Sequence, residues 1–364
     1  MTRSTRFARS VGLVALALVA GVMLVRVLET AVASEETAAA PVLRVDSIAR
    51  VARARSGSVV FLHTVSPQPA GSTWFDGPRP GLAPPGALRD VREGLGSGVV
   101  IDAPGWILTN AHVVEGSEAI HFRTADGDDG DATIVGVDRD LDIALLQAHG
   151  TPALRPIPLG DSDAVNVGDW VVAIGSPFGL HHTVTAGIVS AKARGIDDSG
   201  FDLLQTDVAI NPGSSGGALL NLNGSLIGVT TAIVSAAGEN IGLNFAIPIN
   251  EVTAILKRLR AGDVVRGWVG MRTTELSRAV AQSLGVDAGL MVIALADDGP
   301  AAESGIRLGD VVQGLGGPLA APPADLTRRV LDAAPGTTMV VRVWREGRSI
   351  DVPVEVGERP RIGR

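Results

Sequence analysis

The stretch NPGSSGG, residues 211–217, places two adjacent serines among glycines directly after an apolar run. A serine hydroxyl is a weak nucleophile at neutral pH unless a neighbouring base takes its proton. Glycines beside it let the backbone turn tightly and aim amide N–H groups at a reacting carbonyl oxygen. Taken alone, the stretch is equally typical of a flexible surface turn, so the interpretation depends on finding a base and an acid that orients it.

Chain order separates two templates for such a serine. Residues 213–217 also fit Gly-x-Ser-x-Gly, the nucleophile elbow of α/β-hydrolases, in which the histidine follows the serine. All 6 histidines of this chain precede residue 183, which excludes that template. The order His, Asp, Ser of the chymotrypsin-type triad remains.

Two residues fit this order. His112 lies in LTNAHVV at the end of a strand-like run, where we expect a loop to expose it. Asp142 immediately precedes an apolar run, so its carboxylate is desolvated and needs a partner. The imidazole N–H of His112 would supply one. Taken singly, each residue is more often structural, as a packed histidine or a strand-end aspartate.

Several motifs resemble the HtrA (Deg) family of serine proteases: GSGVVID, WILTNAHVV, DLDIALL, IGSPFGL, LQTDVAINPGSSGGALLNLNGSLIGV and IGLNFAIP. The resemblance covers essentially the whole chain after the N-terminal segment. It implies a mostly β fold, with a chymotrypsin-like double β-barrel protease domain followed by a PDZ domain. It further implies that His112 is the general base, Asp142 its orienting acid and Ser215 the nucleophile, with the amides of Gly213 and Ser215 forming the oxyanion hole.

The nucleophile loop departs from the family at two positions. Ser214 replaces the usual asparagine, and Ala218 stands where proline is common. The backbone amide and the loop conformation matter most at position 214, so we expect the triad to survive. The departures bear on the rigidity of the oxyanion loop.

The residues expected to contact substrate are uncharged. Six residues before the nucleophile, where trypsin carries an aspartate, the chain has Ala209, which gives a basic side chain no counter-charge. By resemblance, Thr231, Ala232 and Ile233 lie along the substrate and line this pocket. Such a wall favours small or medium aliphatic residues, and pairing with a strand edge requires extended or unfolded protein.

The C-terminal part resembles a single PDZ domain. Its GWVGM motif matches the carboxylate-binding loop of the family, and DGPAAESGIRLGDVV matches the most recognisable stretch of the domain. We expect C-terminal peptides to bind by strand addition and by carboxylate capture on backbone amides, beside a helix formed by LTRRVLDAAPG. The loop residues expected to bind the peptide are Gly267, Trp268, Val269, Gly270 and Met271.

The family also implies regulation. The segment from Ser190 to Gly200 precedes the nucleophile loop and is the candidate relay from the PDZ domain. Arg194 aligns with a family arginine that links this loop to the activation region of a neighbouring subunit, although a solvated surface arginine is the plainer interpretation. The resemblance implies a homotrimer.

The N-terminus predicts export. Three arginines precede the fifteen uncharged residues 11–25, and residues 31–33 offer an Ala-Val-Ala cleavage site, which together are typical of a secretory signal. A full membrane span takes about 20 residues, and counting through Arg26 to Leu28 gives eighteen. Both a cleaved signal and an inner-membrane anchor therefore remain open, and we expect a periplasmic or other extracytoplasmic location.

Composition excludes several other chemistries. The net charge of −8 argues against nucleic acid as a main partner. The absence of cysteine excludes disulfides, thiol catalysis and zinc–thiolate sites. The acidic run DGDDGD at 126–131 lacks the glycine and the final acid of a calcium loop, so we interpret it as a hairpin turn. We expect neither a metal nor a cofactor.

Four regions follow from these patterns. We expect residues 1–33 to be the signal peptide or anchor, 34–57 a linker with a short helix, 58–262 the protease domain and 267–358 the PDZ domain. The rival to a protease of quality control or stress signalling is a non-cleaving chaperone or peptide-binding adaptor on the same fold. Digestion of unfolded casein would separate the two.

Overall fold

The structure is a computed structural model that describes residues 47–66, 92–103, 105–150, 154–176, 182–194, 201–233, 242–315 and 323–360. Residues 1–33, and with them the expected signal or anchor, lie outside these ranges, as does most of the proline-rich segment 66–94. Within the described ranges, no helix is both long enough and apolar enough to span a membrane.

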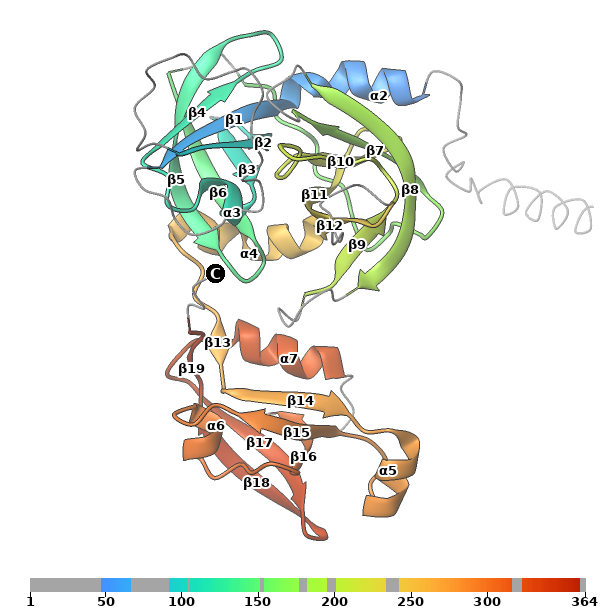
Figure 1. The fold of residues 1–364 in the computed structure, drawn as a ribbon, viewed down its shortest axis with the longest axis vertical. Coiled ribbons are helices and arrows are strands. Elements are labelled where there is room, and N and C mark those ends of the chain that lie inside the picture. Colours follow the sequence, from blue (N-terminus) through green and yellow to red (C-terminus); the bar gives the residue numbers. More distant parts are fainter. Residues whose placement is uncertain are drawn as a thin grey trace, which may run out of the picture. The chain divides into compact units, whose positions relative to one another are not determined.

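The first six strands close into an antiparallel barrel with the strand order β1-β2-β3-β6-β5-β4 (Figure 1). Its strands are β1 (Val59–Ser66), β2 (Arg92–Asp102), β3 (Trp106–Thr109), β4 (Ala119–Arg123), β5 (Asp129–Asp138) and β6 (Ile143–His149). Apolar side chains alternate inward along these strands, and Leu62, Phe122 and Leu146 lie in the resulting core. The acidic run forms the β4–β5 hairpin, with Arg123 paired to Asp129, as expected.

A second six-stranded barrel follows, with the order β10-β11-β12-β9-β8-β7. Its strands are β7 (Trp170–Gly175), β8 (Thr183–Arg194), β9 (Leu203–Thr206), β10 (Ala218–Asn221), β11 (Leu226–Ile233) and β12 (Asn244–Pro248). A tight turn at Gly224, whose φ is +76°, joins β10 to β11. The loop that carries Ser215 therefore connects β9 to β10 of this barrel.

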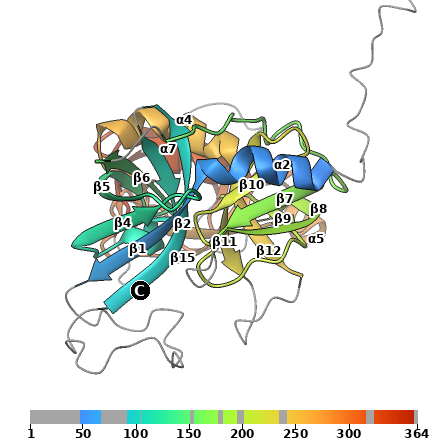
Figure 2. The ribbon, with the colours of Figure 1, turned by 90° about the horizontal axis from the view of Figure 1, so that it is seen from above.

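Three short elements and one longer helix accompany the barrels. They are α2 (Ser47–Arg55), η1 (Ser56–Ser58), α3 (Ala111–Val114) and α4 (Ile249–Ala261). The helix α2 precedes β1 in the chain but packs against β7 of the second barrel (Figure 2). The helix α4 follows the second barrel yet packs against β5 and β6 of the first, so it ties the two barrels together.

The remaining residues form the PDZ fold expected from the sequence. A five-stranded sheet has the order β14-β15-β16-β17-β18, and a separate two-stranded pair joins β13 to β19. The strands are β13 (Gly267–Trp268), β14 (Met271–Glu275), β15 (Leu290–Leu295), β16 (Val311–Leu315), β17 (Thr338–Arg345), β18 (Arg348–Glu355) and β19 (Gly357–Glu358), and the helices are α5 (Arg278–Leu284), α6 (Pro300–Glu303) and α7 (Pro323–Asp332). In this sheet β14 is an edge strand. The mostly β fold of two barrels and a PDZ domain is thus confirmed.

Candidate active site

The structure joins His112 to Asp142 through two kinds of contact. His112 lies in the helical turn α3 rather than in the loop expected from the sequence, and its side chain is 39% exposed. Its Nδ1 lies 2.8 Å from Oδ2 and 3.0 Å from Oδ1 of Asp142, while its backbone N–H donates to Oδ1 over 3.0 Å. An ionised carboxylate only accepts hydrogen bonds, so Nδ1 carries the proton and Nε2 carries the lone pair.

Asp142 is held in an unusual backbone conformation. Its φ is +56°, in the left-handed region that non-glycine residues rarely occupy. The Asn110 side-chain amide donates to its carbonyl oxygen over 2.9 Å, and the Ala111 N–H donates to the same oxygen over 3.2 Å. Neighbouring contacts thus hold a strained residue in place, a pattern found at functional sites. Sequence reasoning missed Asn110, although it stands two residues before His112 in the same motif.

Thr231 connects this pair to Ser215. Its hydroxyl donates to Oδ2 of Asp142 over 2.8 Å, and its backbone carbonyl accepts from the Ser215 hydroxyl over 3.1 Å. Ser215 is nearly buried, with 8% of its surface exposed. One residue of β11 therefore contacts both the aspartate and the serine. The sequence placed Thr231 beside substrate and did not indicate that its hydroxyl contacts Asp142.

The nucleophile loop begins with a tight turn. The Ser214 N–H donates to the Asn211 carbonyl over 2.9 Å, and Gly213 has a φ of +91°. In the turn of residues 211–214, proline occupies the second position, where it is common in type II turns, and glycine the third, where such turns require a positive φ. The turn type determines which way the Gly213 amide points. A serine at position 214, in place of asparagine, is therefore compatible with this backbone.

A small pocket lies beside Ser214. It is lined mainly by small residues, among them Gly175, Thr183, Thr185, Ala209 and Thr230. The Thr185 hydroxyl donates to the Ala209 carbonyl over 3.0 Å, which fixes this wall of the pocket. Of the described residues that line the pocket, none is charged. The side chains of Ala232 and Ile233 lie outside the described residues, so their placement beside substrate stays a prediction.

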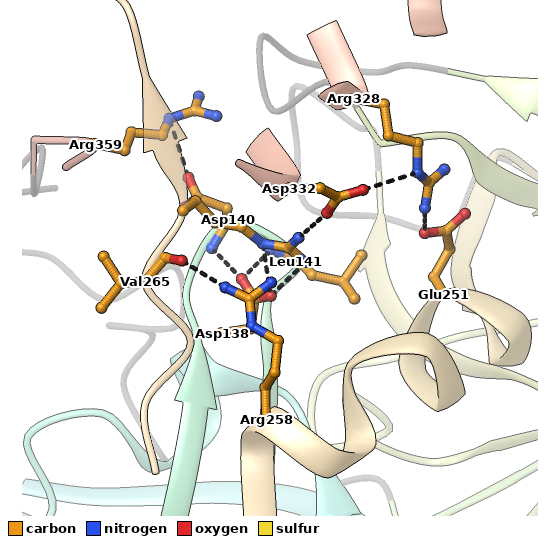
Figure 3. A network of polar contacts seen from close by, with 10 residues as sticks. Asp138, Asp140, Leu141, Glu251, Arg258, Val265, Arg328, Asp332 and Arg359 are labelled. Atoms are coloured by element: carbon orange, nitrogen blue, oxygen red, sulfur yellow. Dashed lines mark hydrogen bonds and ion pairs between the residues drawn. The ribbon is translucent and has the colours of Figure 1, made fainter. Parts of the chain in front are cut away.

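A buried ionic network lies just before Asp142 in the chain (Figure 3). Oδ1 of Asp138 accepts the N–H groups of Asp140 and Leu141, each over 3.1 Å, and its Oδ2 accepts Nε and Nη2 of Arg266 over 3.0 and 2.6 Å. The side chains of Asp138 and Arg266 are 0% and 1% exposed. Arg266 also donates to Asp332, at the end of α7, over 2.7 Å.

The expected peptide-binding loop spans β13 and the start of β14. Val269 is buried, and its carbonyl accepts the Ala301 N–H over 2.8 Å. Gly270 has a φ of +75°, and its carbonyl accepts the Ala296 N–H over 2.8 Å. Arg194 ends β8, where its backbone pairs with Leu203. Its side chain and residues 195–200 lie outside the described residues.

Two protein families and several solved structures match this chain. Residues 96–229 match the trypsin-like peptidase domain, and residues 267–356 match the PDZ domain. An HtrA-type protease, AlgW, solved with a tripeptide, is 34% identical and aligns with a TM-score of 0.74 over 86% of this chain and 97% of its own. The chain belongs to the HtrA-type serine proteases. A serine endoprotease from Yersinia pestis, 32% identical over 86% of this chain and 98% of its own, gives a TM-score of 0.65.

Curated relatives of this HtrA-type chain carry one name, probable periplasmic serine endoprotease DegP-like. The relative from Ectopseudomonas mendocina (strain ymp) is 42% identical over 283 residues, and that from Halomonas elongata is 43% identical over 283 residues. These alignments cover 77% and 76% of this chain. The chain spans 60% of the length of each relative.

Proposed function

We propose that this chain is a serine endopeptidase in which Ser215 is the nucleophile, His112 the general base and Asp142 the acid that orients it. The observation that carries the proposal is the hydrogen-bonded series from His112 through Asp142 and Thr231 to Ser215. His112 and Asp142 belong to the first barrel, and Thr231 and Ser215 to the second. The series therefore brings together residues of both barrels, as a substrate bound between the barrels requires. The family membership supports the same roles.

The proposed reaction follows from the tautomer of His112. Its Nδ1–H donates to Asp142, so Nε2 accepts the proton of the Ser215 hydroxyl as Oγ bonds to the substrate carbonyl carbon. The carbonyl oxygen becomes an oxyanion and accepts the amides of Gly213 and Ser215. His112 then protonates the leaving amine, and the carbon–nitrogen bond breaks. Water repeats the sequence on the acyl-enzyme and releases the second fragment.

The pocket beside Ser214 supports cleavage after small aliphatic residues. Its lining residues Thr183, Thr185 and Ala209 are small and uncharged. A lysine or arginine side chain would lose its hydration there without gaining a counter-charge. We propose extended or unfolded segments of proteins as substrates, because the substrate backbone has to lie in the cleft as a strand.

The PDZ domain is proposed to bind C-terminal peptides. Among the strands that the structure describes, β14 lies at the edge of its sheet beside β15, where a peptide strand can be added, and it begins directly after the loop of residues 267–270. The solved AlgW structures that carry a decapeptide or a tripeptide support this proposal. Binding there would shift the loops at the active site, with Arg194 as the candidate relay between subunits of a homotrimer.

The proposed setting is the periplasm, where the curated relatives are named to act. The N-terminal 33 residues would direct export and either be cleaved or hold the enzyme at the inner membrane. In that setting the enzyme would act in protein quality control or stress signalling. Sequencing the N-terminus of the protein from the membrane and soluble fractions would distinguish the two fates.

Exchange of the nucleophile tests the function directly. Ser215→Ala should abolish casein fragmentation with little effect on the melting temperature, because within the described part of the chain the hydroxyl donates a single hydrogen bond of 3.1 Å, to the Thr231 carbonyl. Loss of a triad serine costs roughly 10⁶-fold in turnover in a well-studied protease. Ser162→Ala is the matched control and should retain activity. It removes another buried serine hydroxyl, which accepts the Asn250 N–H at the start of α4.

Two outcomes would contradict the proposal. If Ser215→Ala kept a tenth of the wild-type rate, another group would be the nucleophile, and Ser214 would be tested next. If the wild-type protein protected casein from aggregation and produced no fragments, the adaptor function would be correct. The same samples serve for both measurements.

A further inference from the structure

Ser97, in β2 of the first barrel, contacts the nucleophile loop of the second at two points. It is 0% exposed. Its backbone N–H donates to the Ser215 carbonyl over 2.8 Å, and its hydroxyl donates to the Gly213 carbonyl over 2.8 Å. The hydroxyl also accepts the Ser176 N–H over 2.9 Å at the end of β7. Ser97 lies 116 residues before Gly213 in the chain, so only the folded arrangement of the barrels creates these contacts.

The two carbonyls determine the orientation of two peptide planes. The Gly213 carbonyl belongs to the peptide plane that joins Gly213 to Ser214, and the Ser215 carbonyl to the plane that joins Ser215 to Gly216. The Ser215 amide lies in the plane between them, and the Gly213 amide in the plane just before them. Planar peptides rotate only at φ and ψ. Holding the Gly213–Ser214 and Ser215–Gly216 planes therefore restricts the Ser215 amide from both sides and the Gly213 amide from one side.

The glycines of this loop make such restraint necessary. Gly213 and Gly216 have φ values of +91° and +82°, and glycine backbones reach many other conformations at low cost. Close packing holds Ser97 in turn. The Thr109 hydroxyl donates to the Ser97 carbonyl over 2.7 Å, and a Cβ atom at position 216 would overlap that carbonyl oxygen. The first barrel thus adds to the restraint from the second, in which the Thr230 hydroxyl donates to the Ser214 carbonyl over 2.7 Å and the Thr230 carbonyl accepts the Gly216 N–H over 2.8 Å.

We propose that Ser97 is a positioning residue that orients the amides of the oxyanion hole through its hydroxyl. The proposal rests on the serine-protease function proposed above and adds a residue whose hydroxyl bonds to Gly213 and Ser176 rather than to a member of the triad. Without the hydroxyl, the buried Gly213 carbonyl and Ser176 N–H lose their partner, and the Gly213–Ser214 peptide gains freedom to rotate. The transition state then loses stabilisation, while binding of the uncharged ground state is retained.

The test compares Ser97→Ala, Ser97→Thr and the control Ser162→Ala in the full chain. Three quantities are measured: kcat and KM for a peptide with an aliphatic residue before the cleaved bond, the inhibition constant of the matching peptidyl trifluoromethyl ketone, and the rate constant of labelling by a fluorophosphonate. The ketone forms a tetrahedral anionic adduct, so its affinity reports the oxyanion hole. The labelling rate constant, unlike the labelled amount, is independent of how much protein is folded.

We expect kcat of Ser97→Ala to fall about 10- to 100-fold. Deleting an oxyanion-hole donor outright lowers kcat roughly 10²- to 10³-fold, and a misoriented donor should lower it by no more than that. KM should stay within about threefold, since the effect is on the transition state. Ketone affinity and labelling rate should fall in parallel with kcat. Ser97→Thr, which keeps the hydroxyl, should recover most of each loss, and Ser162→Ala should match the wild type in all three.

Several results would overturn this role for Ser97. A Ser97→Ala variant whose labelling rate constant equals that of the wild type shows that the loop is oriented without it, whatever the folded fraction. A Thr variant no better than the Ala variant shows that the hydroxyl is not responsible. A fall in kcat with unchanged ketone affinity places the effect outside the oxyanion hole. A wild-type protein that the fluorophosphonate does not label would instead contradict the protease function itself.

Discussion

Thr231 contacts both the aspartate and the serine of the site, one through its hydroxyl and one through its carbonyl. The carbonyl contact is available to any residue type, whereas the hydroxyl contact requires threonine or serine. Asp142 Oδ2 accepts this hydroxyl as well as Nδ1 of His112. The hydroxyl therefore helps to keep the carboxylate in the plane that orients the imidazole.

Thr231→Val removes this donor and keeps the shape of the side chain. A hydrogen bond to a charged group contributes about 1.5–3 kcal/mol, so we expect kcat to fall roughly 10- to 100-fold. The free energy of unfolding should fall by no more than about the same 1.5–3 kcal/mol. Thr206→Val is the matched control, because its buried hydroxyl donates to the Ile188 carbonyl within the second barrel. Equal losses of kcat in the two variants would assign the effect to barrel stability rather than to Asp142.

The sequence predicted His112, Asp142 and Ser215 because residue type, chain order and motif all restrict these positions. It could not predict Ser97, Asn110 or the second contact of Thr231. Ser97 and Asn110 donate to backbone carbonyls far away in the chain, and a hydrogen bond to a carbonyl leaves no pattern in the partner's residue type. The Thr231 hydroxyl donates to the Asp142 carboxylate of the other barrel. These contacts depend on how the barrels meet.

At the scale of elements, α4 is the connection between the barrels. The sequence INEVTAILKRLRAG, residues 249–262, has the spacing of an amphipathic helix that ends at a glycine, and Gly262 has a φ of +136°. The partners of its apolar face were not predictable, because its buried residues share a core cluster with Ile143 and Leu145 of β6, more than a hundred residues earlier. At Gly136 of β5 the contact is so close that a Cβ atom would overlap the carbonyl oxygens of Leu259 and Gly262.

Gly136→Ala should therefore destabilise the protein by displacing the end of α4. Its φ lies outside the left-handed region, so the cost is steric, about 1–3 kcal/mol or more, as is usual for overpacking. Thermal unfolding of the variant measures this cost. Thr133→Ala, on an exposed position of the same strand, should change the free energy of unfolding by less than about 0.5 kcal/mol. An unchanged melting temperature for Gly136→Ala would show that α4 packs differently.

At the scale of the whole molecule, Arg266 ties distant segments together. It stands between α4 and β13 in the chain, and its guanidinium contacts Asp138 at the end of β5 and Asp332 at the end of α7. It also lies over the ring of Phe201, 5.0 Å from its centroid. An arginine suits this place because its planar group satisfies several acceptors at once. No local pattern in the sequence pairs residues 138 and 266.

A double-mutant cycle measures this pair. Arg266→Met alone leaves the buried Asp138 carboxylate without its cation and should lower the free energy of unfolding by about 3–5 kcal/mol. In the Asp138→Asn background, the same exchange should cost much less, because the remaining amide carries no charge. Chemical denaturation followed by tryptophan fluorescence gives the four free energies. Additive losses would show that the two side chains act independently.

The division of the site between two barrels has a consequence for synthesis. Chains emerge with the N-terminal residues first and fold largely domain by domain. A nascent chain that has reached residue 200 contains His112 and Asp142 but neither Ser215 nor Thr231, and α4 follows later still. The proposed protease therefore has no active site during most of its own production. Cleavage becomes possible only when the second barrel has closed, so unfinished copies of the enzyme do not endanger one another.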